Sequence, residues 1–374
     1  MITISLCMIV KNEEKVLARC LESVRAAVDE IIIVDTGSKD KTKEIAYRFT
    51  DKVYDFPWIE DFSAARNASF SYATCDYQMW LDADDVLEPR ELEKLIRLKQ
   101  TLSPEVDIVT MRYNTHFDER GNPVLTSNRE RLLRRERRYR WQDPVHECIP
   151  LVGNVHYSDI TVSHRKIVEP GAPVSFRNLR IYEKLEAEGK PMTPRQLYYY
   201  ARELKDHQLY DRAAEKFRMF LDTGLGWHED TIAACHSLGV CYRMLKQPDK
   251  MLPALTRSFQ YGTPRAEVLC EMAQYFRGQG RDDLAIAWYE IAADLKPPQG
   301  NAGFLLWDYW GYVPHLELCV LHYRKGDIEK ALWHNEQAAK IKPGSAAVQL
   351  NRQFFDTLRQ NRQAAENAAA NQTD

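Results

Sequence analysis

Residues 78–85 read Gln78-Met79-Trp80-Leu81-Asp82-Ala83-Asp84-Asp85, an apolar run that leads into a group of acidic residues. A short apolar run of this kind predicts a buried strand, and the acidic residues then follow its carboxyl end. Toward the N-terminus the chain alternates between such runs and amphipathic helical patterns. We expect strands at 2–10, 31–34, 53–56 and 78–81, with helices around 16–24, 39–49 and 61–73 between them. Repeated strand–helix units predict a parallel sheet covered by helices, in which ligands bind at the carboxyl ends of the strands.

Beyond residue 100 the pattern changes. Residues 106–164 hold shorter strand-like pieces, which predict the second half of a mixed sheet within an α/β domain of residues 1–168. Residues 169–193 are interrupted by proline and glycine and are interpreted as a linker. Residues 194–359 follow a helical pattern. The stretch 360–374 is rich in Ala, Asn and Gln and is interpreted as a flexible tail.

The helical region is repetitive. A 34-residue helix–turn–helix template fits registers that begin at 194, 232, 266 and 312. In the third register, nine positions carry the residues that a tetratricopeptide repeat requires, namely Leu269, Met272, Ala273, Phe276, Gly280, Ala285, Tyr289, Ala292 and Pro297. Such units stack into a curved solenoid. The aromatic insertion 303–312 is interpreted as a hydrophobic cap or a homodimer contact, or else as a platform for a peptide or a sugar.

Composition disfavours several classes of function. The 374 residues carry 51 basic and 54 acidic side chains, a formal net charge of -3 that gives no global attraction to nucleic acid or to an anionic membrane. No apolar run is long enough to span a bilayer, and the first residues lack the pattern of a secretory signal, so we expect neither. Eight cysteines without a Cys-x-x-Cys pair indicate reduced thiols and a cytoplasmic protein.

Carboxylates that follow two of the predicted strands are candidates for ligand binding. Because side chains alternate along an extended chain, Asp82 and Asp84 should face the same side and can hold one divalent cation against a diphosphate. The alternative is a charged turn in which an aspartate caps a helix at Pro89. Asp35 can accept a hydrogen bond from a base N–H or a ribose hydroxyl. No Gly-x-Gly-x-x-Gly motif follows the first strand, which disfavours a dinucleotide-binding domain.

Four motifs, in this order, resemble those of the family 2 glycosyltransferases with a GT-A fold. They are Cys7-Met8-Ile9-Val10-Lys11-Asn12-Glu13-Glu14, Val34-Asp35-Thr36-Gly37-Ser38, Asp61-Phe62-Ser63-Ala64-Ala65-Arg66-Asn67 and Asp82-Ala83-Asp84-Asp85. The resemblance implies that residues 1–168 transfer a sugar with inversion from a UDP-sugar donor, aided by Mn²⁺ or Mg²⁺. It assigns Val10, Asn12, Glu14, Asp35, Arg66 and Asp82 to the donor, and Asp82 and Asp84 to the metal.

The segment Trp141-Gln142-Asp143-Pro144-Val145-His146-Glu147 carries the candidate catalytic base. An inverting transfer needs one group to take the acceptor proton on the face opposite the leaving nucleotide. His146 and Glu147 are adjacent, so on a strand only one of them can face the site. We favour Glu147, because inverting enzymes of this fold usually employ a carboxylate, and we assign His146 to diphosphate or substrate contact. Which of the two is the base stays open.

His164 and an arginine-rich segment complete the candidate site. His164 resembles a histidine that completes the metal shell in some of these enzymes, although Arg165 and Lys166 replace the glycine and aromatic residue that often follow. Imidazole with carboxylates suits manganese as well as magnesium. Seven arginines between positions 129 and 140 lack interleaved aromatic residues apart from Tyr139, which disfavours a nucleic-acid partner. Two of them, Arg131 and Arg134, are instead assigned to the diphosphate or the acceptor.

The combination of these domains resembles the bacterial glycosyltransferases that modify peptides, including those that glycosylate cysteine in glycopeptide bacteriocins. The resemblance is carried by residues 61–67, by Val145-His146-Glu147 and by Ala201-Arg202-Glu203-Leu204. It implies transfer of a hexose from a UDP-sugar to a peptide or protein side chain. Two alternatives stay open: transfer to a cell-surface glycan or a lipid-linked saccharide, and a repeat-based adaptor without catalytic activity.

Overall fold

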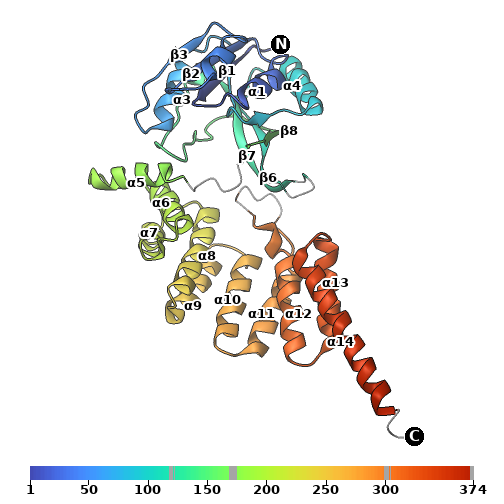
Figure 1. Cartoon of the computed structure of the whole chain (residues 1–374). Coiled ribbons are helices and arrows are strands. Elements are labelled where there is room, and N and C mark those ends of the chain that lie inside the picture. The colour runs from blue at the N-terminus through green and yellow to red at the C-terminus, as the bar shows by residue number, and fades with distance from the viewer. Residues whose placement is uncertain (118–120, 122, 168–174, 299–302, 304, 371–374) are drawn as a thin grey trace. The chain divides into compact units, whose positions relative to one another are not determined.

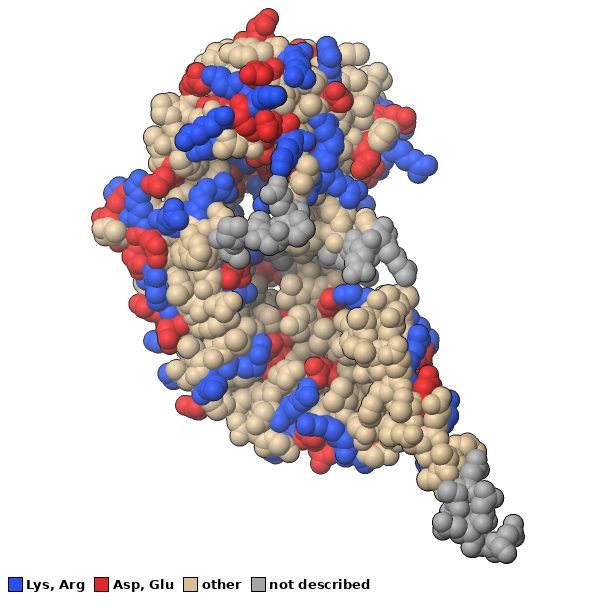
Figure 2. All heavy atoms as spheres, viewed as in Figure 1, with Lys and Arg blue, Asp and Glu red and all other residues tan. Residues whose placement is uncertain are grey.

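The computed structural model describes residues 1–117, 121, 123–167, 175–298, 303 and 305–370. The chain divides into two compact units, Met1–Met192 and the residues from Thr193 onward, and each is described by itself (Figure 1). On the face shown in Figure 2, basic and acidic side chains are interspersed over both units. Within the described residues, no helix combines the length and the apolar character that crossing a bilayer requires.

The first unit is built on one eight-stranded mixed sheet, with the strand order β3-β2-β1-β4-β7-β6-β8-β5. Its first four strands, β3, β2, β1 and β4, run parallel to one another. Strand β7 is antiparallel to β4 and β6, and β8 is parallel to β6. The strands are β1 (Ile4–Val10), β2 (Glu30–Asp35), β3 (Val53–Asp55), β4 (Tyr77–Trp80), β5 (Asp85–Val86), β6 (Ile108–Phe117), β7 (Pro123–Arg134) and β8 (Val155–His164). This arrangement confirms the predicted α/β fold, since parallel strands come first and a mixed half follows.

Helices cover both faces of this sheet. Alternation along β1 sends Leu6 and Met8 to one face, where they join the core with residues of α1, and sends Cys7 to the other face, where Phe70 of α3 packs. The helices of this unit are α1 (Leu17–Val24), α2 (Thr42–Ala46), α3 (Phe62–Ser71), α4 (Pro89–Thr101) and α5 (Arg177–Ala187), with a short 3₁₀ turn at Arg135–Arg137. The apolar content of the predicted strands therefore corresponds to a sheet that is buried on both sides.

Helix α5 corrects the interpretation of residues 169–193 as a linker. The helix buries Leu179, Ile181 and Tyr182, and the Tyr182 hydroxyl donates to the carbonyl of Val145 at 3.4 Å. The prolines and glycine on either side of the helix had suggested a connector, but the stretch between them has an apolar face. Residues 168–174 lie outside the described part of the chain.

The second unit consists of helices that pack in consecutive pairs, α6 with α7, α8 with α9, α10 with α11 and α12 with α13 (Figure 1). The first helices of these pairs begin at Pro194, His228, Ala266 and Tyr312, close to the predicted registers. The helices are α6 (Pro194–Asp206), α7 (Tyr210–Thr223), α8 (His228–Met244), α9 (Pro248–Arg257), α10 (Ala266–Gly278), α11 (Asp282–Asp294), α12 (Tyr312–Arg324), α13 (Ile328–Ile341) and α14 (Ala346–Ala370), with 3₁₀ turns at Ser258–Gln260 and Trp307–Tyr309. The helical repeats are thus tetratricopeptide-like.

Close contact within a pair depends on small residues. A Cβ added at Gly239 of α8 would lie 2.4 Å from a methyl carbon of Leu255 in α9, so only glycine fits there. The C-terminal helix α14 corrects another interpretation, because residues 360–370 of the predicted flexible tail are helical. Alanine has the highest helix propensity, and the stretch is rich in it. Residues 371–374 lie outside the described chain.

Candidate functional site

The candidate site begins where the parallel strands β1 and β2 end. The last residues of these strands, Val10 and Asp35, are paired in register. The carbonyl of Val10 accepts hydrogen bonds from the backbone N–H and the hydroxyl of Thr36, at 2.9 and 3.1 Å. The structure therefore joins the segments that follow the two strands into one edge, where ligands of such sheets bind.

Asp35 is 1% exposed, and only one of its two carboxylate oxygens accepts hydrogen bonds within the described residues. Its Oδ1 accepts hydrogen bonds from the backbone N–H groups of Gly37 and Ser38, both at 2.9 Å, in a turn for which Gly37 adopts a φ of 101°. Its Oδ2 is buried and has no hydrogen-bond partner within the described residues. A buried carboxylate oxygen without a donor is costly, so the position fits a ligand that brings an N–H or O–H group.

Asn12 and Glu14 connect the two segments. Asn12 has a φ of 57°, its N–H donates to the Ser38 hydroxyl at 2.9 Å, and its Oδ1 accepts from the N–H of Lys39 at 2.8 Å. Glu14 accepts from the N–H of Lys41 at 3.1 Å. Both side chains that were predicted to bind the donor are therefore occupied in holding the loop that surrounds Asp35.

Arg66 projects from α3, whose first turn is capped by Asp61 through a 2.9 Å hydrogen bond from the N–H of Ala64. Its guanidinium is 7% exposed and lies 4.8 Å from the ring centres of both Trp80 and Trp141. The Nη2 group donates to Asp82 Oδ1 at 2.7 Å. Burial opposes the charge, but the neighbouring carboxylates raise the pKa of Arg66 above its ordinary value.

The second carboxylate bound to Arg66 is Glu147, whose Oε1 accepts from Nε at 2.7 Å. Glu147 lies in a loop closed by a single bridge between Gln142 and Cys148, so it does not stand on a strand as the sequence suggested. His146 beside it has a φ of 54°, and its ring stacks 6.3 Å from that of Tyr182. The left-handed backbone at His146, and not strand alternation, sets the direction of these two side chains.

The geometry that the sequence predicted for Asp82 and Asp84 is wrong, because β4 ends at Trp80 and the acidic motif forms a turn. The N–H of Asp85 donates to the Asp82 carbonyl at 3.0 Å, and the N–H of Asp82 donates to Asp85 Oδ2 at 3.0 Å. Asp82 thus faces Arg66. Burial opposes its charge, but Arg66 and then Arg131 lower the pKa of Asp82 to about 2.

Asp84 instead joins His164 and Asp85, and the three offer ligand atoms within 4.8 Å of one another. Nδ1 of His164 lies 3.1 Å from Asp84 Oδ1 and 3.2 Å from Asp85 Oδ1. Burial lowers the pKa of His164, but hydrogen bonds to the two aspartates outweigh it and raise the pKa to about 10. Carboxylates that favour a proton on the imidazole also favour a metal ion in its place, so the donor set fits a divalent cation.

Asp85 is the member of this group that sequence reasoning missed. It is fully buried, and Oδ2 pairs with Arg131 Nη1 at 3.1 Å while Oδ1 accepts from the Tyr113 hydroxyl at 2.9 Å. Arg131, which was assigned to the diphosphate or the acceptor, is also fully buried, with its guanidinium 3.8 Å from the Trp80 ring centre. Asp85 and Arg131 hold the acidic turn and His164 in place.

Comparison with known proteins gives the family of the first unit. Residues 5–152 match the family described as Glycosyl transferase family 2. The N-terminal unit contains a family 2 glycosyltransferase domain. The chain is also 33% identical over 301 residues to a TPR repeat-containing protein of Synechococcus elongatus, an alignment that covers 78% of this chain and 66% of the relative. That alignment is longer than either unit, so the likeness extends beyond the glycosyltransferase domain.

Two further matches cover smaller parts of the chain. The SPbeta prophage-derived glycosyltransferase SunS of Bacillus subtilis is 28% identical over 239 residues, which are 59% of this chain and 55% of SunS. The crystal structure of MamA is 20% identical and covers 43% of this chain and 85% of its own, with a TM-score of 0.35. The chain spans about two thirds of the first relative's length and about half of SunS.

Within the glycosyltransferase domain, the prediction for Arg134 is wrong. Arg134 pairs in register with Tyr77, the first residue of β4, and therefore lies at the edge of the sheet opposite the acidic turn. Its side chain bonds to the Pro104 carbonyl and to Glu136. Arginine-rich sequence alone could not show that β7 runs antiparallel to β4, which brings its last residue to the amino end of β4.

Glu13 is a second residue that sequence reasoning missed, although it lies in the first motif. Burial, followed by the negative charges of Asp84, Asp82 and Asp40, raises its pKa to about 7. The negative charges of the acidic turn thus act on Glu13. Its position between Asn12 and Glu14 was the available signal.

Proposed function

We propose that this protein is a metal-dependent, inverting glycosyltransferase that moves a hexose from a UDP-sugar to a peptide or protein side chain. One relationship carries the proposal: Arg66 joins Asp82 of the acidic turn to Glu147, beside the pair Asp84 and His164. A candidate base and a candidate metal site are thereby fixed to one edge of the sheet. In this proposal residues 1–168 perform the chemistry and residues 194–359 serve the acceptor.

The donor side is formed by Asp35 and by the Asp84–His164 pair. The unpartnered Oδ2 of Asp35 accepts a hydrogen bond from the base or the ribose. Asp84 and His164 would hold the cation, and Asp85, 3.2 Å from Nδ1 of His164, would orient the imidazole. When bound, a divalent cation neutralises the charge that develops on the leaving diphosphate. Arg66 supports this arrangement indirectly, since its guanidinium donates to the carboxylates of Glu147 and Asp82.

Glu147 is the proposed base. Its carboxylate takes the proton of the acceptor hydroxyl or thiol while the acceptor atom bonds to the anomeric carbon and the bond to the diphosphate oxygen breaks. Arg66 fixes one oxygen of Glu147 through the 2.7 Å hydrogen bond from Nε to Oε1. His146 lies next to this carboxylate and is proposed to contact the acceptor. The tetratricopeptide-like repeats favour a peptide as that acceptor, because solenoids of this kind present extended binding surfaces.

Mass spectrometry of the products tests the proposal. The full chain is incubated with a panel of UDP-hexoses, with Mn²⁺ or Mg²⁺, and with peptide or saccharide acceptors. We expect the parent chain to attach a hexose to peptides, and Glu147→Gln to attach at least about a hundredfold less. Glu22→Gln, on the exposed face of α1, is the control and should leave transfer unchanged. Sugar on saccharides alone would exclude the peptide acceptor. No UDP release under any condition would exclude the transferase and favour the adaptor.

A further inference from the structure

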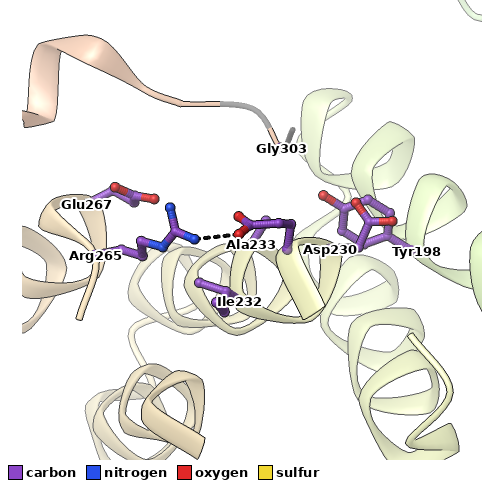
Figure 3. Close-up of a pocket in the computed structure, with 8 residues that line it drawn as sticks. Tyr198, Asp230, Ile232, Ala233, Arg265, Glu267 and Gly303 are labelled. Atoms are coloured by element: carbon purple, nitrogen blue, oxygen red, sulfur yellow. Dashed lines mark hydrogen bonds and ion pairs between the residues drawn. The ribbon is translucent and has the colours of Figure 1, made fainter. Parts of the chain in front are cut away.

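The aromatic segment 305–310 belongs to the helical unit and has no role in the mechanism proposed above. It follows Gly303, which lines a small space together with Tyr198 of α6, Asp230 of α8 and Glu267 at the start of α10 (Figure 3). The first helices of these three pairs are neighbours, since α8 packs against both α6 and α10. They form one continuous surface, here called the first-helix face, from residues 194–206, 228–244 and 266–278. Solenoids bind their partners on extended surfaces of this kind.

Tyr309 seats the segment on the first-helix face. Its ring lies 6.1 Å from that of His236 in α8, at an interplanar angle of 77°. Burial, followed by the nearby carboxyl group of Glu271 in α10, raises the pKa of Tyr309 to about 12. The 3₁₀ turn Trp307–Tyr309 also packs against α10 and α12. The chain thus places one of its own tyrosine rings on the surface where a bound peptide would lie.

The residues before Tyr309 are loosely attached. Leu306 and Trp307 are 43% and 46% exposed, so they add little buried apolar surface to the contact. Asp308 pairs with Lys342 at 2.9 Å, but both side chains are about half exposed, and surface pairs of this kind stabilise little. A hydrophobic cap would instead bury its large side chains.

The contact also leaves two polar atoms unpaired. Nε2 of His236 and Nε1 of Trp310 are both buried, and neither has a hydrogen-bond partner within the described residues. An unpaired buried polar group opposes the packing that buries it. The seated segment is therefore only weakly stabilised, and a peptide can displace it.

We infer that the first-helix face binds a peptide through a tyrosine side chain, and that Tyr309 occupies this place until the peptide displaces it. The inference rests on the proposed function in naming this peptide as the acceptor. The segment then acts as an internal competitor. If it occupies the place about nine-tenths of the time, the apparent affinity for a peptide falls about tenfold. Because a peptide without a suitable ring does not displace the segment, the contact also selects among acceptors.

Binding of a labelled peptide to the full chain, without nucleotide sugar or metal, tests the inference independently of catalysis. The probe has the sequence of residues 305–312, with a lysine added at each end for solubility. Tyr309→Ser frees the place, so we expect this variant to bind the probe at least about tenfold more tightly than the parent. A second probe, with serine at the position of Tyr309, should not show that gain. Donor turnover is measured in parallel, so failure of the glycosyltransferase proposal remains distinguishable from failure of this one.

Two further variants locate the effect. Trp307→Ser, at an exposed ring of the same turn, is the matched control and should bind the probe as the parent does. Asp308→Lys sets two cations against each other at Lys342, so it should loosen the segment and raise the affinity in the same direction as Tyr309→Ser. Thermal unfolding verifies that each variant is folded. Equal binding by the parent, Tyr309→Ser and Asp308→Lys, an equal gain with Trp307→Ser, or no binding of the probe by any of these chains would each overturn the inference.

Discussion

Arg66 and Glu147 lie 81 positions apart in the sequence, and Nε of the first donates to Oε1 of the second at 2.7 Å. The same guanidinium donates to Asp82 and lies 4.8 Å from the ring centres of two tryptophans. One buried cation thus fixes both the candidate base and the acidic turn. The geometry of the site therefore depends on Arg66, which belongs neither to the acidic motif 82–85 nor to the segment 141–147.

Replacement of Arg66 by Met should destabilise the first unit and abolish transfer. The change leaves the carboxylates of Asp82 and Glu147 without their cation, a loss worth about 3 to 5 kcal/mol for a buried pair. Urea unfolding followed by tryptophan fluorescence measures the free energy of unfolding. Arg90→Met, at an exposed position of α4, is the control and should change it by less than about 0.5 kcal/mol. If Arg66→Met unfolds with the same free energy as the parent, the ion pairs of Arg66 with Asp82 and Glu147 contribute nothing to stability.

Substitution of Asp35 by Asn should weaken the binding of UDP while the fold is retained. Oδ1 remains as the acceptor for Gly37 and Ser38, but the unpartnered Oδ2 becomes an NH₂ group that faces the donor of the ligand. Loss of one buried hydrogen bond and the resulting conflict correspond to roughly 10- to 100-fold in affinity. Calorimetric titration with UDP measures the change, with the exposed Asp51→Asn as control. Equal affinities of parent and Asp35→Asn would remove Asp35 from the donor site.

The stability of the first unit should depend on pH through Glu13. Burial and three aspartates raise its folded-state pKa from 4.5 to about 7, so the folded state holds more protons between these values and stability falls as pH rises through them. Glu13→Gln removes this loss. In the presence of a chelator we expect the variant to be more stable than the parent by about 1 to 2 kcal/mol at pH 8, allowing for partial exposure, and equal to it near pH 4. Thermal unfolding at both pH values provides the comparison, and a parent that is the more stable at pH 8 would contradict it.

The fourth helical pair should respond to pH in the opposite sense, through His334. Burial, followed by His315 and His322, lowers its pKa from 6.5 to about 4. Its ring lies 5.2 Å from that of each neighbour, and its Nδ1 is 3.0 Å from Nδ1 of His315. Because the unfolded state takes up the proton first, the stabilisation is present above pH 6.5 and is lost as pH falls toward 4, by about 2 kcal/mol.

Hydrogen exchange of α13 between pH 7 and pH 5 measures this loss. Exchange of α10 and α11 at the same pH values is the internal reference, since the intrinsic rates change equally for both. We expect α13 to lose protection relative to that reference, and His334→Phe to lose less than the parent, since His315 and His322, whose pKa values burial also lowers, remain. Equal behaviour of the two helical pairs would show that the buried histidines do not titrate as described.

The sequence predicted the fold closely where hydrophobic periodicity determines it. The registers at 194, 266 and 312 coincide with helix starts, and the four parallel strands are where the apolar runs are. Periodicity failed for α5, because the prolines and glycine on either side of it concealed the apolar face of a helix of only 11 residues. It failed for the tail because polar composition was taken as disorder, whereas alanine favours a helix.

The candidate site was predicted in its residue types but not in its geometry. Asp84 and His164 do meet, whereas Asp82 turns to Arg66 because the strand ends two residues before it. That outcome depends on a turn whose hydrogen bonds involve Asp85, and no spacing rule contains it. Arg134 was assigned from charge alone, which carries no information about strand direction.

Binding of UDP in the presence and absence of Mn²⁺ tests the central claim most directly. Calorimetric titration is performed on the parent chain, on Asp84→Ala and on the exposed control Glu22→Ala. We predict that the parent and the control bind UDP at least about tenfold more tightly with Mn²⁺, because the ion is held by Asp84 and His164, and that Asp84→Ala loses this gain. A parent chain that binds no UDP, or an Asp84→Ala variant that keeps the full effect of Mn²⁺, would contradict the account.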